Sequence, residues 1–115
     1  MKQSTLTRLL RVWRKRIPMI SPWKIRIRLE RADKMDGTLG RCDMYVEMQM
    51  AQITILHPDD RNGKPEESNP EVDLIHELLH IVLDGHCPQQ RYSVPHEVAI
   101  NALSETLYRA YHKNS

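Results

Sequence analysis

Two histidines and a glutamate stand at a spacing that suits a metal-dependent hydrolase. They are His76, Glu77 and His80 of the segment His-Glu-Leu-Leu-His. Residues four apart in a helix share one face, so the two imidazoles could bind one zinc ion between them. Glu77 would lie at the flank of that face, where its carboxylate could take a proton from a zinc-bound water. The motif is typical of zinc hydrolases, most often metallopeptidases.

The elements around the motif agree with this interpretation. Residues 70–84 are predicted to form a helix, with Asn69 and Pro70 as N-cap and first-turn residues and Gly85 as a left-handed C-terminal residue. Apolar residues recur along this segment at three- and four-residue steps, at Val72, Ile75, Leu79, Val82 and Leu83. An ordinary core helix with two histidines on its edge is the alternative.

The rest of the chain predicts two more helices and three strands. Helices are expected at residues 4–16 and 95–112, the second with a buried stripe formed by Ile100, Leu103, Leu107 and Tyr111. Strands are expected at residues 23–31, 42–48 and 52–56, the last two joined as a hairpin. Because strands precede helices, we expect an α+β fold with a small antiparallel or mixed sheet packed against the motif helix.

A catalytic zinc needs a third protein ligand and one open position. His86 follows His80 by six residues, but Leu83 stands where the metzincin pattern has its turn glycine. His96 and Glu97 begin the last helix, and a carboxylate from such a helix would complete a His2Glu site. Helical phase alone does not choose between them.

Two segments together resemble a known group of enzymes. Residues 74–80, followed after a loop by residues 97–103, are similar to the small zincin metallopeptidases of phages and prophages, on the gluzincin side, and to ImmA/IrrE-type proteases. The resemblance implies a zincin-like fold with His76, His80 and Glu97 as Zn²⁺ ligands and Glu77 as general base. It also implies a supporting role for Asn101, where thermolysin-like gluzincins have aspartate.

The expected reaction is peptide-bond hydrolysis, with a zinc-bound water as nucleophile. Tyr92, His86 and His96 are candidates for the group that stabilises the oxyanion. The resemblance further implies that the strand at residues 52–56 lies along the cleft. A peptide or protein substrate could then add to its edge as a further strand.

Charge is unevenly distributed along the chain. Residues 1–31 hold ten Lys and Arg and one acid, whereas the remaining residues hold seven Lys and Arg and fourteen acids. The basic segment could contact nucleic acid or dock on the acidic remainder over the cleft, but a solvated helix face and a basic edge strand explain it as well. The second function class is thus a nucleic-acid- or protein-binding regulator with a structural zinc site.

Length and composition fit one domain, with residues 1–22 as a basic helix and linker. No apolar run approaches a membrane span, and two cysteines are too few for a disulfide framework. We therefore expect a cytoplasmic protein without a membrane partner, acting in the host cytoplasm if a phage encodes it.

Overall fold

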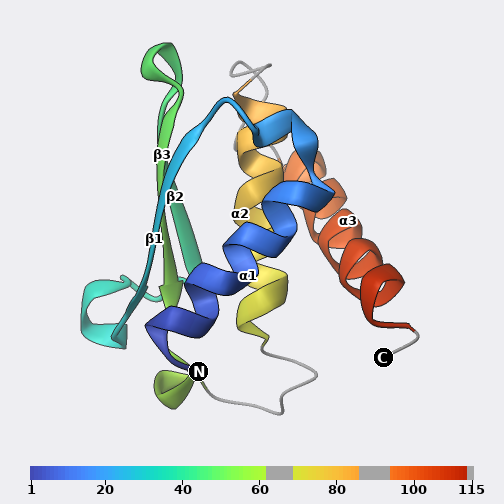
Figure 1. Cartoon of the computed structure of the whole chain (residues 1–115). Coiled ribbons are helices and arrows are strands. Elements are labelled where there is room, and N and C mark those ends of the chain that lie inside the picture. Colours follow the sequence, from blue (N-terminus) through green and yellow to red (C-terminus); the bar gives the residue numbers. More distant parts are fainter. Residues whose placement is uncertain (62–68, 86–93, 114–115) are drawn as a thin grey trace.

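The computed structural model describes residues 1–61, 69–85 and 94–113. Within them the chain forms three helices and three strands, as the α+β prediction required (Figure 1). The helices are α1 (Gln3–Arg16), α2 (Pro70–Asp84) and α3 (Val94–His112), and the strands are β1 (Lys24–Glu30), β2 (Gly40–Tyr45) and β3 (Met50–Leu56). No helix in the described part of the chain has the length and apolarity to cross a membrane.

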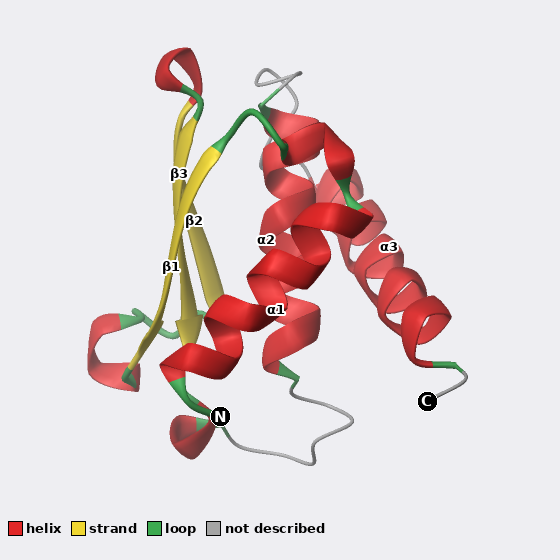
Figure 2. Cartoon of the chain, in the orientation of Figure 1, coloured by secondary structure: helices red, strands yellow, loops and turns green. Residues whose placement is uncertain are grey.

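The sheet is mixed, and its strand order is β1-β3-β2. Strand β3 lies in the centre, parallel to β1 and antiparallel to β2. Helices α1 and α2 lie on one face of the sheet, and α3 packs on α2 away from the sheet (Figure 2). No helix of the described residues covers the opposite face.

One edge of the sheet is occupied by a side chain. Gln3, at the start of α1, donates from its amide to the carbonyl oxygen of Ile27 at 2.9 Å. Its Oε1 accepts a hydrogen bond from the backbone N–H of Leu29 at 2.8 Å. The Gln3 amide therefore forms hydrogen bonds with backbone groups of β1, as a neighbouring strand would. In the described part of the chain, the outer edge of β2 is the sheet edge without such a partner.

The hairpin differs from the prediction at its turn. The second strand ends at Tyr45 instead of residue 48, and Val46–Met48 form a 3₁₀ turn. Gln49 then adopts a left-handed conformation with φ of 49° and reverses the chain into β3. The apolar alternation of Met44, Val46 and Met48 is typical of a longer strand, but Met48 is 67% exposed at the hairpin tip.

Helix α2 has the predicted bounds. The Asn69 side chain caps it by accepting a hydrogen bond from the N–H of Glu71 at 2.9 Å. The predicted left-handed conformation of Gly85 is wrong, since this residue has φ of −66°. Glycine is needed there for space, because a Cβ would lie 2.8 Å from the Trp23 ring.

The buried stripe of α3 also differs from the prediction. Ile100 and Ser104 are fully buried, whereas Leu103 and Tyr111 are 45% and 47% exposed. Helix α3 packs mainly against α2, so the narrow stripe that meets α2 is the best covered.

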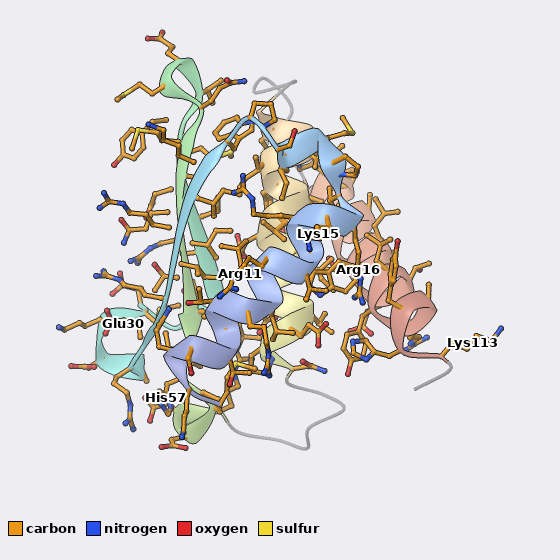
Figure 3. The ribbon with its side chains drawn as sticks, viewed as in Figure 1. Arg11, Lys15, Arg16, Glu30, His57 and Lys113 are labelled. Carbon is orange, nitrogen blue, oxygen red and sulfur yellow. The ribbon has the colours of Figure 1, made fainter. Side chains whose placement is uncertain are left out.

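A polar cluster ties the far end of α3 to the core. Buried Glu71 accepts a hydrogen bond from Trp13 Nε1 at 2.7 Å, and His112 Nε2 lies 3.0 Å from the same carboxylate. Arg16 lies between α1 and α3, over the rings of Trp13 and Tyr111 (Figure 3). These contacts link all three helices and so help set the position of α3, which carries Glu97.

Candidate metal centre

Three side chains from α2 and α3 converge at one point. His76 and His80 lie on the same face of α2, and their Nε2 atoms are 3.2 Å apart. Glu97, in the first turn of α3, places Oε1 2.9 Å from His80 Nε2 and Oε2 3.4 Å from His76 Nε2. The structure thus brings together the three residues that the sequence resemblance implied as ligands.

The donor set fits a small divalent cation. Ligand atoms on a tetrahedral zinc ion, with bonds of about 2.0–2.2 Å, lie about 3.3 Å from one another. Here the two imidazole nitrogens are 3.2 Å apart, and the two oxygens of the Glu97 carboxylate lie 2.9 Å from His80 Nε2 and 3.4 Å from His76 Nε2. Two imidazole nitrogens that face each other beside a carboxylate form an electron-rich pocket that favours a cation.

The two histidines also have partners behind the site. His80 Nδ1 lies 2.7 Å from Oδ2 of Asp84, one turn further along α2. The Asn101 side chain lies within hydrogen-bonding reach of His76. Burial and the neighbouring His80 nevertheless lower the pKa of His76, so its neutral, metal-binding form is favoured.

Asp84 also belongs to the site, although the His-Glu-x-x-His motif does not include it. It ends α2, and its place four residues after His80 puts it on the same helix face. Its second oxygen, Oδ1, lies 2.5 Å from His96 Nε2. His96 therefore lies behind His80, and Glu97 is the α3 residue that faces both histidines. His86 and Tyr92 lie outside the described residues.

Glu77 lies beside this centre with 6% of its surface exposed. Its carboxylate rests against the backbone of β2, where a Cβ on Gly40 would lie 3.0 Å from Glu77 Oε2. Glycine at this position leaves room for the carboxylate. Burial, followed by the charges of nearby carboxylates such as Asp73 and Glu97, raises the pKa of Glu77 to about 8. A cation at the centre would oppose this shift.

An open pocket of about 330 Å³ adjoins the three ligand candidates. Its lining comes from residues 40–44 of β2 and from His76, Glu77, His80, Asp84 and Glu97. The prediction that the strand at residues 52–56 lies along the cleft is therefore wrong. That strand is β3, which has a neighbour on each side, whereas β2 has a free edge and lines the pocket.

Comparisons of the chain with protein-family models, curated proteins and solved structures gave no significant match. The resemblance to zinc peptidases therefore stays a hypothesis that rests on the motif and on the geometry of this centre.

The basic amino-terminal segment does not cover the pocket. None of the described lining residues comes from residues 1–31. Arg11 and Lys15 lie on the outer surface of α1 (Figure 3), and Lys24, Arg26 and Arg28 are exposed on β1. Part of this charge is paired with acids, as Arg31 with Asp60 at 2.8 Å. Within the described residues, the basic segment therefore does not dock over the cleft.

Proposed function

We propose that the protein is a zinc-dependent peptidase with His76, His80 and Glu97 as metal ligands. The observation that carries this proposal is the convergence of three side chains, in which the two Nε2 atoms lie 3.2 Å apart and each lies within 3.4 Å of an oxygen of the Glu97 carboxylate, at a pocket that also holds a buried glutamate. A structural zinc site would instead be closed by a fourth protein ligand. The three ligand candidates instead line an open pocket, which favours a coordination position that is left for substrate and water.

Glu77 is the general base in this proposal. Zinc at such a centre supplies Lewis-acid polarisation of a carbonyl and lowers the pKa of water. The carboxylate of Glu77 is buried against Gly40, and this packing limits its movement. From that position it would accept a proton from the attacking water and pass it to the leaving amine.

The free edge of β2 supports an extended peptide as substrate. The backbone N–H of Leu56 on β3 bonds the carbonyl of Leu39, so in this antiparallel register Arg41, Asp43 and Tyr45 turn their backbone groups toward β3. The backbone groups of Gly40, Cys42 and Met44 then point outward along the pocket. A peptide that pairs with them would run past Glu77 as an added strand.

The test is to purify the protein, measure its zinc content and assay hydrolysis of an unfolded protein such as reduced casein. We expect about one zinc ion per chain and hydrolysis that stops with a chelator and returns with zinc. Protein that refuses added zinc would overturn the proposal. Zinc bound without hydrolysis, together with salt-dependent binding to nucleic acid, would favour the regulator with a structural zinc.

Replacing Met44 with proline is expected to impair substrate binding while keeping the pairing of β2 with β3. The N–H that proline removes faces outward, and proline is tolerated on edge strands in that position. We expect kcat/KM for a casein-derived peptide to fall at least about 10-fold, mainly through a higher KM, because one peptide hydrogen bond is lost and the ring obstructs pairing.

The matched control is proline at Asp43, whose N–H faces β3. That variant should lower the melting temperature more than Met44→Pro does, because it breaks the sheet ladder. If Met44→Pro hydrolyses the peptide as the wild type does, β2 is not the substrate edge.

A further inference from the structure

Asp84 is the most deeply buried acid near the metal centre. It ends α2 and is 1% exposed. Each of its carboxylate oxygens faces a different imidazole, with Oδ2 2.7 Å from His80 Nδ1 and Oδ1 2.5 Å from His96 Nε2. A charge buried this deeply is tolerated only when it is paired, so both contacts are needed.

These three residues could be taken for a second cation site, since their ligand atoms lie within 4.8 Å of one another. The separations argue against that. Ligand atoms on one zinc ion are about 3.3 Å apart, whereas His80 Nδ1 and Asp84 Oδ2 form a hydrogen bond at 2.7 Å and His96 Nε2 makes a close polar contact with Asp84 Oδ1 at 2.5 Å. The group is therefore a chain of direct polar contacts from α3 through Asp84 to His80.

We propose that Asp84 and His96 are positioning residues for the metal centre. Asp84 accepts a hydrogen bond from His80 Nδ1–H, which leaves the Nε2 lone pair directed at His76 and Glu97. His96 holds the other oxygen of Asp84 and so keeps the carboxylate in place. This inference rests on the proposed function, because it assigns a purpose to the orientation of a proposed zinc ligand.

The chain also links α2 to the start of α3. His96 and its neighbour Glu97 reach opposite sides of His80, one through Asp84 and the other directly at 2.9 Å. Both ring nitrogens of His80 are therefore in contact with a carboxylate, Nδ1 with Asp84 and Nε2 with Glu97. Asp84 thereby helps to place Glu97 as well as His80, since His96 anchors the same helical turn.

The first measurement is zinc affinity, by chelator competition, for the wild type, Asp84→Ala and Asp84→Asn. Removing a carboxylate that orients a metal-binding histidine typically weakens metal binding about 10- to 100-fold. We expect that loss for Asp84→Ala and partial recovery for Asp84→Asn, which keeps one acceptor oxygen. Asp43→Asn is the control for loss of a negative charge at the same pocket, and its zinc affinity should match the wild type.

The second measurement does not need zinc. Nitrogen-15 NMR of the imidazoles in the metal-free protein reports which ring nitrogen of His80 carries the proton. We expect Nδ1 to be protonated in the wild type and the proton to redistribute to Nε2 in Asp84→Ala. A role of Asp84 in stability alone would lower the melting temperature without changing this tautomer.

His96→Ala tests the same chain from the other helix, even if the Asp84 variants fold poorly. It should weaken zinc binding in the same direction but less than Asp84→Ala. The double variant should lose little more than Asp84→Ala alone, since His96 acts through Asp84.

The outcomes separate the two proposals. If the wild type binds zinc without hydrolysing peptides, and Asp84→Ala weakens zinc binding and shifts the His80 tautomer, the positioning role stands and the peptidase proposal falls. If the wild type binds zinc and hydrolyses peptides while neither Asp84→Ala nor His96→Ala changes affinity or tautomer, the positioning role is overturned.

Discussion

Replacing Glu77 with glutamine is expected to abolish hydrolysis and leave zinc bound. Glutamine has nearly the same shape, so it can keep the contact with Gly40 and fill the same buried space. It cannot accept a proton from water, and loss of a general base typically lowers the rate about 100- to 10,000-fold. The measurements are kcat/KM on a casein-derived peptide and the zinc content of the purified variant.

The result is decisive only if the variant keeps its metal. Glu77 is not among the three side chains that converge on the centre, so the zinc affinity of Glu77→Gln should stay close to that of the wild type. Wild-type rates in a zinc-loaded Glu77→Gln protein would rule out Glu77 as the base. Loss of both zinc and activity would instead place Glu77 among the ligands.

The second large effect is expected from His76→Ala, which should lose the metal and all zinc-dependent activity. Even a residue that only orients a ligand contributes about 10- to 100-fold to metal affinity, so removal of a ligand should weaken binding at least 100-fold. His76 is a suitable choice because its side chain is 19% exposed, and its replacement leaves the Asp84 contacts of His80 in place.

Thermal unfolding with and without zinc measures this effect directly. A ligand that binds only the folded state adds about 2.7 kcal/mol of stability at 100 times its Kd. We expect zinc to raise the melting temperature of the wild type but not of His76→Ala. His57→Ala is the matched control, because His57 caps a 3₁₀ turn away from the pocket and its removal should leave the zinc response intact. An equal zinc response in wild type and His76→Ala would contradict the assigned ligands.

Much of the local structure could be predicted from neighbouring residues. The capped and periodic segment of α2 has the predicted bounds, since Asn69 and Pro70 affect only the first turn of the helix in which they lie. The strict alternation of Ile25, Ile27 and Leu29 with basic residues is typical of a half-buried strand, and in β1 these three side chains pack against the core. Predictions failed where burial depends on a distant partner, as at Leu103, which is apolar enough for the core but is 45% exposed.

The amino-acid sequence by itself determined that two imidazoles and a glutamate share one stretch of α2, because helical spacing is a local property. Only the tertiary structure decided that Glu97 and not His96 faces those imidazoles, because the rotation of α3 depends on how Ile100 and Ser104 pack against α2. Only the tertiary structure also decided which strand lines the pocket. Strand order comes from pairing between segments far apart in the chain, and this pairing places β3 in the centre and leaves the edge of β2 open beside Glu77.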